Sequence, residues 1–181
     1  MSGERRSGKA GNEVRPANED ASAAPQPGHL RVAFAELSLA ALDAATVDSI
    51  GLLVGEDDRP LTGLGQLCDW RLCGGLSRML REGTFRGAEG EALLMPGRPR
   101  LAVTRLFLFG RPPAGASGLG YGPMLTALGR ARVESVGLEP PPMPEPDQVA
   151  AFLEALAPLE GKKVVLFGAT AELKRMLKSA R

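Results

Sequence analysis

A glycine-rich segment, Gly115–Pro123 (Gly-Ala-Ser-Gly-Leu-Gly-Tyr-Gly-Pro), has the residue types and spacing in this chain that best suit anion binding. It follows a predicted strand at 101–109 and precedes a predicted helix at 123–132. Backbone N–H groups of such a segment, with the positive end of the helix dipole, can hold a phosphate. A plain connector is the simpler alternative, because a lone glycine-rich loop is a weak signal. The candidate ligand-binding residues are Gly118, Gly120, Tyr121 and Gly122.

A pair of arginines provides a second candidate anion surface. Arg71 and Arg78 are seven positions apart in a predicted helix at 64–82, so they share one helix face. Nucleic acid is not an expected partner, because no aromatic residues that would stack on bases are interleaved with these arginines. A solvated helix face is therefore the alternative. The neighbouring Trp70, the only tryptophan, is predicted to pack in the core.

The residues needed for metal or covalent chemistry are sparse. The only acidic cluster, Glu56–Asp58, lies on one loop before Pro60 and is predicted to be a solvated turn, because adjacent carboxylates without further ligands bind hard cations weakly. His29 is the only imidazole that a nucleophile could use as a base. Cys68 and Cys73 are too few for a zinc site. We therefore expect no catalytic residue, no metal site and no cofactor.

Composition narrows the class of protein further. The formal net charge is +1, which favours neither nucleic acid nor membrane as a partner, and 44% hydrophobic residues suffice for a core. No run of 18 apolar residues occurs, so we expect no transmembrane helix, and the cysteine usage suits a reducing cytoplasm. Residues 1–28 are mostly small, polar and charged, which predicts a disordered tail. Residues 29–181 are predicted to form a single domain.

Strands and helices alternate along that domain, which predicts an α/β layered architecture. The strand 101–109 is joined to a strand at 91–95 by Pro96-Gly-Arg-Pro99, and the resulting hairpin makes the sheet mixed. Gly74 and Gly75 interrupt the helix at 64–82 and indicate a kink or close packing. Further strands are expected at 30–35, 50–54, 133–138 and 164–167, and further helices at 38–43, 123–132, from Pro146 to Gly161, and after Thr170.

Several short motifs resemble those of the N-terminal domain of the leucyl aminopeptidase (cytosol aminopeptidase) family. They are Pro60-Leu61-Thr62-Gly63 in the first loop, Gly83-Thr-Phe-Arg-Gly87 in a turn, and Leu106-Phe-Leu-Phe-Gly110 at the end of the hairpin. The resemblance spans roughly residues 30–180. It implies a fold that resembles a macro domain, a three-layer α/β/α sandwich around a mixed sheet.

The resemblance also shapes the functional hypotheses. The family's two-metal chemistry lies in a separate catalytic domain, and its Asn-Thr-Asp-Ala-Glu-Gly-Arg-like signature does not occur here. We therefore expect a stand-alone, non-catalytic interaction, assembly or regulatory module that associates with itself or with a separate protein subunit. One alternative is a macro-like binder of a phosphate-containing ligand, ADP-ribose or a nucleotide, at the 115–123 loop. Another is the N-terminal portion of a metal-dependent aminopeptidase.

Overall fold

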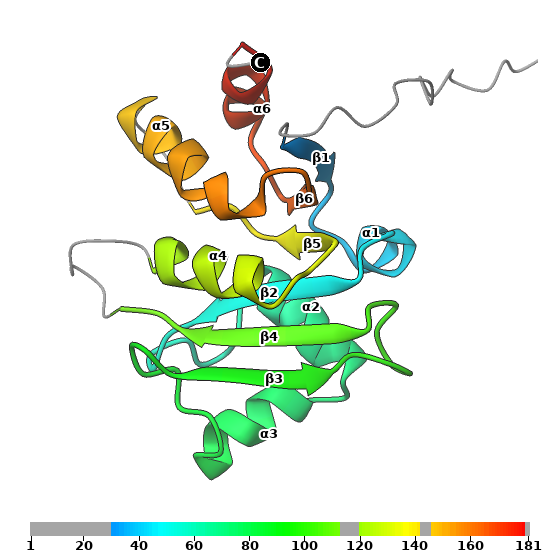
Figure 1. The fold of residues 1–181 in the computed structure, drawn as a ribbon. Coiled ribbons are helices and arrows are strands. Elements are labelled where there is room, and N and C mark those ends of the chain that lie inside the picture. The colour runs from blue at the N-terminus through cyan, green and yellow to red at the C-terminus, as the bar shows by residue number, and fades with distance from the viewer. Residues whose placement is uncertain (1–29, 113–119, 142–145, 180–181) are drawn as a thin grey trace, which may run out of the picture.

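The computed structural model describes residues 30–112, 120–141 and 146–179, which contain a six-stranded sheet in the order β1-β6-β5-β2-β4-β3 (Figure 1). All neighbouring strands are parallel except β3, which runs antiparallel to β4. The predicted mixed sheet and hairpin are therefore confirmed. The strands are β1 (Arg31–Ala35), β2 (Ser49–Val54), β3 (Ala92–Pro96), β4 (Arg105–Gly110), β5 (Ser135–Leu138) and β6 (Lys163–Phe167).

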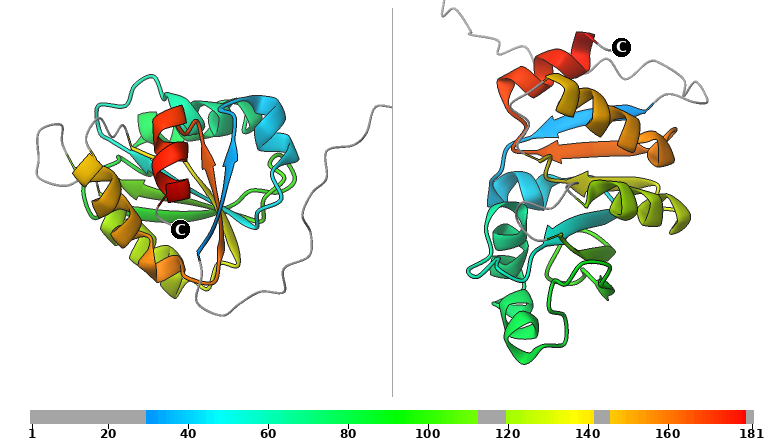
Figure 2. Two further views of the ribbon diagram at one scale, coloured as in Figure 1. Left: turned by 90° about the horizontal axis from the view of Figure 1, so that it is seen from above. Right: turned by 90° about the vertical axis from the view of Figure 1, so that its left-hand side faces the viewer.

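Helices cover both faces of this sheet (Figure 2). Side chains of α1, α2 and α3 share a core with one face, and those of α4, α5 and α6 share a core with the other. This confirms the predicted three-layer α/β/α sandwich. No helix within the described ranges is long and apolar enough to cross a bilayer. The helices are α1 (Leu39–Ala44), α2 (Gly63–Arg71), α3 (Gly75–Glu82), α4 (Tyr121–Arg130), α5 (Pro146–Ala155), the 3-10 helix η1 (Ala157–Leu159) and α6 (Ala171–Ser179).

Local sequence signals explain where several elements lie. Strand β2 is buried along almost its whole length, as expected for a short apolar run in the centre of a parallel sheet. The Ser38 hydroxyl accepts the N–H of Ala41 at 3.2 Å and begins α1. The Thr170 hydroxyl accepts the N–H of Leu173 at 3.1 Å and begins α6. Each of these caps satisfies a backbone donor that the helix itself leaves unpaired.

The single long helix predicted after the first loop is wrong, because the chain forms two helices there, α2 and α3. Cys73 and Gly74 between them adopt left-handed conformations, with φ of 55° and 76°, which a continuous right-handed helix does not permit. The Asp69 carboxylate then accepts the N–H groups of Leu76 at 2.8 Å and Ser77 at 3.0 Å. The glycine pair therefore marks a break followed by a new capped helix.

Two smaller predictions also differ from the structure. Trp70, expected in the core, is 71% exposed, whereas Leu64 and Cys68 supply the buried face of α2. The strand predicted at 101–109 begins only at Arg105, and the residues before it reach the core from an irregular connection. Apolar residue type predicted burial for Leu101 and Val103 but not their backbone conformation, and for Trp70 it did not predict burial either.

Candidate ligand-binding cleft

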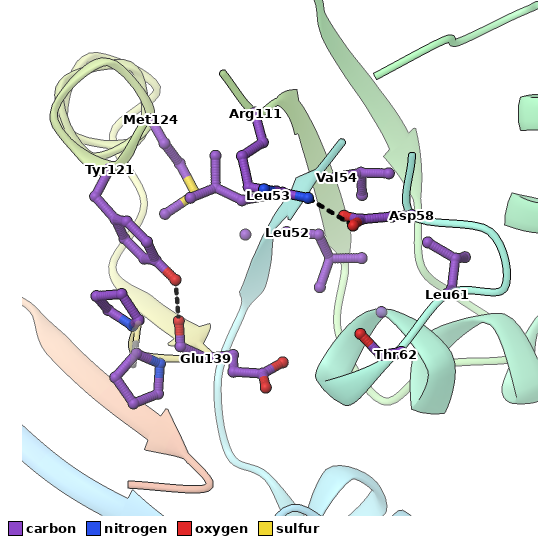
Figure 3. A pocket seen from close by; sticks show the side chains of 14 residues that line it. Leu52, Leu53, Val54, Asp58, Leu61, Thr62, Arg111, Tyr121, Met124 and Glu139 are labelled. Atoms are coloured by element: carbon purple, nitrogen blue, oxygen red, sulfur yellow. Dashed lines mark hydrogen bonds and ion pairs between the residues drawn. The ribbon is translucent and has the colours of Figure 1, made fainter. Parts of the chain in front are cut away.

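The carboxyl ends of β2, β4 and β5 meet at one edge of the sheet, because these strands are parallel neighbours. A cavity of about 330 Å³ opens at this edge, between the beginnings of α2 and α4 (Figure 3). Leu52, Leu53, Leu61 and Met124 supply apolar walls. Ligands of open α/β sheets bind in crevices at the carboxyl ends of the strands, which makes this cavity the candidate site.

The α2 side of the cleft is closed by Glu139. Its Oε2 accepts the N–H of Leu64 at 2.6 Å, whereas the N-cap residue Thr62 makes no side-chain cap. Gly63 has φ +57° and must lack a side chain here, since a Cβ would lie 2.6 Å from the Glu139 Cδ. A carboxylate of the protein itself therefore occupies the positive end of this helix.

The α4 side of the cleft is open in the part of the chain that the structure describes. Gly120 is the N-cap residue, with φ +74°, and no side-chain cap is found at this end. The first N–H groups of a helix have no acceptor within the helix, and here they belong to Tyr121 and Gly122. Pro123 carries no N–H. This helix end therefore offers two backbone donors and a positive dipole beside the cavity.

Tyr121 connects the two sides of the cleft. Its hydroxyl donates a hydrogen bond to the Glu139 carbonyl oxygen at 2.8 Å (Figure 3). The ring packs edge-on against Phe152, with centroids 5.6 Å apart. Burial raises the pKa of the Tyr121 hydroxyl, the charge of Glu139 raises it further, and Arg111 opposes both effects. The hydroxyl therefore remains protonated and acts as a donor across the neutral pH range.

The guanidinium of the cleft is already paired within the protein. Arg111 Nη2 lies 2.6 Å from Asp58 Oδ1 and 3.1 Å from Asp57 Oδ1. Asp58 Oδ2 also accepts the N–H of Gly55 at 2.7 Å. Glu56 and Asp57 are exposed, as expected for a solvated turn, but Asp58 is held by this network. Among the described residues, the α4 end rather than Arg111 is therefore the positive group of the cleft that has no paired acceptor.

The structure brings three of the predicted ligand residues together. Gly120, Tyr121 and Gly122 lie at the start of α4, which begins two residues earlier than the predicted Pro123. Gly118 lies outside the described residues, as does His29. Within the described ranges, no group of three His, Cys, Asp or Glu side chains is placed to hold a metal ion.

The two arginines of the predicted anion surface lie on two separate helices rather than on one. Arg71 ends α2 and pairs with Asp43, with 2.8 Å between Nε and Oδ1, whereas Arg78 lies exposed on α3. The break between the two helices removes the periodicity from which a shared face was predicted. Their role in anion binding stays a prediction.

Sequence reasoning missed the two side chains that organise the cleft, Arg111 and Glu139. Each comes directly after a strand, Arg111 after β4 and Glu139 after β5. That position was a usable signal, because polar residues at the carboxyl ends of adjacent parallel strands converge on one edge of the sheet.

Comparison with known proteins identifies the fold. No protein-family profile matches the sequence, and no curated protein matches it. Among solved structures, a mutant of tomato leucine aminopeptidase superposes with a TM-score of 0.59 at 16% identity, over 90% of this chain but only 36% of that one. The macrodomain of Thermus aquaticus DarG gives 0.54 at 17% identity, over 76% of this chain and 98% of that one. The IBV X-domain superposes with a TM-score of 0.56 at 14% identity, over 86% of this chain and 100% of that one. The chain therefore has a macro-like fold, which the N-terminal domain of leucine aminopeptidase shares.

Proposed function

We propose that this domain binds a small phosphate-containing ligand, ADP-ribose or a nucleotide, in the cleft between α2 and α4. The observation that carries the proposal is the α4 N-terminus, which no described side chain caps, beside a cavity of about 330 Å³. The position of that cavity at the carboxyl ends of parallel strands supports it, and so does the likeness to macrodomains.

Each wall of the cleft has a role in this proposal. The N–H groups of Tyr121 and Gly122 hold the phosphate, together with the dipole of α4. Leu53 and Met124 contact the apolar face of a base or sugar. The carboxylate of Glu139 lies on the opposite wall, where it accepts hydrogen bonds from hydroxyl or amino groups.

A thermal-shift titration with ADP-ribose, ADP and AMP tests the proposal. A ligand that binds only the folded state stabilises it by about 2.7 kcal/mol at a hundred times its Kd. Gly122 is exposed, and a Cβ there meets nothing within 4 Å. Gly122→Asp should therefore fold normally but lose the ligand-dependent shift, because its carboxylate repels the phosphate, whereas Gly122→Ala should retain most of it. An equal shift in both variants would overturn the assignment to α4.

The second candidate function is assembly through the sheet edge. Strand β3 ends the sheet, and Leu94 on it is 55% exposed. An exposed edge strand is a template for pairing with another chain. Under this candidate the molecular mass in solution rises with concentration, and Leu94→Lys lowers the higher-mass fraction more than Leu94→Ala. A single monomer mass over the whole concentration range would exclude it.

Both candidates are binding functions without catalysis. The third hypothesis, the N-terminal portion of a metal-dependent aminopeptidase, draws support from the likeness to 36% of the tomato enzyme's chain. We expect this chain alone to show no turnover of leucine anilides with manganese or zinc. Turnover by the pure protein that Gly122→Asp leaves unchanged would overturn the non-catalytic proposal without touching the ligand-binding one.

A further inference from the structure

A groove crosses the surface formed by α2, α3 and the loop before α2. Two depressions, of about 610 and 310 Å³, adjoin each other and share Pro60, Leu61 and Ser77 in their linings. Trp70 lines the first depression and Arg81 lines the second. The two adjoining depressions are called the α2–α3 groove below.

One end of the groove is apolar and exposed. Trp70 is 71% exposed there, beside Pro60 and Leu61. Trp70 lies where it does because the helix breaks here. Asp69 caps α3, and α2 ends at Arg71, the residue after Trp70. Tryptophan is enriched among the residues that dominate protein–protein binding energies, so an exposed indole beside the apolar part of a groove is a candidate contact for a partner.

The other end of the groove carries unneutralised positive charge. Arg59 and Arg81 line it, both are exposed, and neither makes an ion pair with a described residue. The acids that line the groove are already engaged. Asp69 accepts backbone N–H groups of α3, at 2.8 and 3.0 Å, and Asp58 pairs with Arg111 at 2.6 Å. The charge that complements this end is therefore negative.

We propose that the α2–α3 groove docks an acidic peptide segment of a partner protein. An apolar side chain of that segment packs on Trp70 and Pro60, and its carboxylates pair with Arg59 and Arg81. This pattern matches the anatomy of peptide interfaces, in which an aromatic anchor lies beside charges that set specificity and association rate.

A protein segment fits the groove better than single-stranded nucleic acid does. Nucleic-acid channels present successive aromatic platforms on which bases stack, but Trp70 is the only aromatic residue lining either depression. The net charge of the chain, +1, also gives little of the long-range attraction that a polyphosphate backbone requires.

The groove is distinct from the ligand-binding cleft, although they are neighbours. Asp58 and Leu61 line both, so the loop that carries them is the wall between the two sites. The peptide-docking proposal rests on Trp70 and the free arginines, and the cleft proposal rests on α4. Either proposal can therefore fail without the other.

Tryptophan fluorescence gives a direct test, because Trp70 is the only tryptophan in the chain. The probes are short synthetic peptides of glutamate with one leucine or phenylalanine anchor, and matched peptides with lysine in place of glutamate. We expect the glutamate peptides to give a saturable blue shift that weakens with added salt, and the lysine peptides to give none.

Matched variants locate the site. The double variant Arg59→Glu, Arg81→Glu should weaken the binding of the glutamate peptides by about tenfold or more, because each carboxylate then faces a like charge. The double variant Arg130→Glu, Arg132→Glu makes the same charge change at exposed positions outside the groove lining and should leave binding within about twofold. The melting temperature of each variant without peptide confirms that it folds.

Three results would overturn this proposal. One is the absence of any saturable change in Trp70 emission with the glutamate peptides. Another is an equal loss of binding in the two double variants. The third is a shift produced by oligothymidine but not by the peptides, which would assign the groove to nucleic acid. A flat ADP-ribose titration bears only on the cleft.

Discussion

Two helix N-termini border the same cleft and differ in one respect. Each is entered through a glycine with positive φ, Gly63 at +57° and Gly120 at +74°. At α2 the Glu139 carboxylate accepts the N–H of Leu64, whereas at α4 no described side chain caps the helix. A helix N-terminus attracts an external anion only where the chain does not supply one of its own.

Sheet topology explains the difference. Strand β5 is the parallel neighbour of β2, and Leu138 at its end lies opposite Gly51. The next residue, Glu139, is therefore delivered to the side of the cleft where α2 begins. As a result, the cleft is closed by a carboxylate at the start of α2 and open at the start of α4. We expect a phosphate to bind at the start of α4.

The largest test of this comparison places the same alanine at each helix. Gly63→Ala should lower the free energy of unfolding by about 2–3 kcal/mol, because this position has a positive φ that alanine adopts only with strain, and because the added Cβ would displace the Glu139 carboxylate. Gly122→Ala, where a Cβ meets nothing within 4 Å, should be neutral or stabilise by about 0.5 kcal/mol. Urea denaturation measures both, and equal effects would contradict the comparison.

Removing the internal anion should make the two ends alike. Glu139→Ala should cost about 1–2 kcal/mol through loss of the cap on Leu64, and Glu139→Gln should cost less because its amide oxygen still accepts that N–H. With the end of α2 open, inorganic phosphate should raise the melting temperature of Glu139→Ala more than that of the native chain. An identical response to phosphate would show that Glu139 does not exclude anions.

The hydrogen bond from Tyr121 to the Glu139 carbonyl, which joins the two sides of the cleft, predicts a loss of stability at alkaline pH. Tyr121→Phe should cost about 1 kcal/mol near neutral pH, because the bond to the Glu139 carbonyl is lost. The folded-state pKa of Tyr121 is raised, so above about pH 10 the unfolded chain releases this proton first and stability falls as pH rises. Denaturation between neutral and alkaline pH should show a smaller decline for Tyr121→Phe. Parallel curves would mean that Tyr121 titrates normally.

The smallest expected change in stability comes from placing a carboxylate at the start of α4. In the absence of ligand, Gly122→Asp should stabilise the protein by about 0.3–1 kcal/mol, because the carboxylate complements the dipole of α4. Added salt should reduce that gain. Gly122→Asn is the matched control without charge. A gain of the same size in Gly122→Asn would remove the electrostatic explanation.

Much of the fold was predictable because its causes are local. Ser38 and Thr170 cap helices through bonds that span three positions. The turn residues Pro96 to Pro99 signalled the β3–β4 hairpin, although its connection also donates a backbone N–H group to the distant Asp48 carbonyl. Gly74 signalled an irregularity in the predicted helix, but the sequence pattern predicted a kink or close packing where the structure has a complete break between α2 and α3. Its cap also depends on Asp69, which contacts residues seven and eight positions further along.

Part of the candidate cleft was also visible in the sequence. The run that contains Gly120, Tyr121 and Gly122 was predicted to meet an anion at a helix start, and the structure places these three residues at the start of α4, where Tyr121 lines the cavity. The open end of the cleft was therefore accessible to sequence reasoning. The closed end was not, because it depends on the strand order.

The sequence by itself determined the alternation of strands and helices, the hairpin and the glycine-rich helix start, because periodicity and capping act over a few residues. Only the tertiary structure decided that Glu139 closes α2, that Arg111 is paired with Asp58, and that Trp70 faces solvent. The first two contacts join residues 75 and 53 positions apart. Contacts of that range depend on which strands are neighbours, and side-chain burial depends on where a helix breaks. Neither is written in the local pattern of residues.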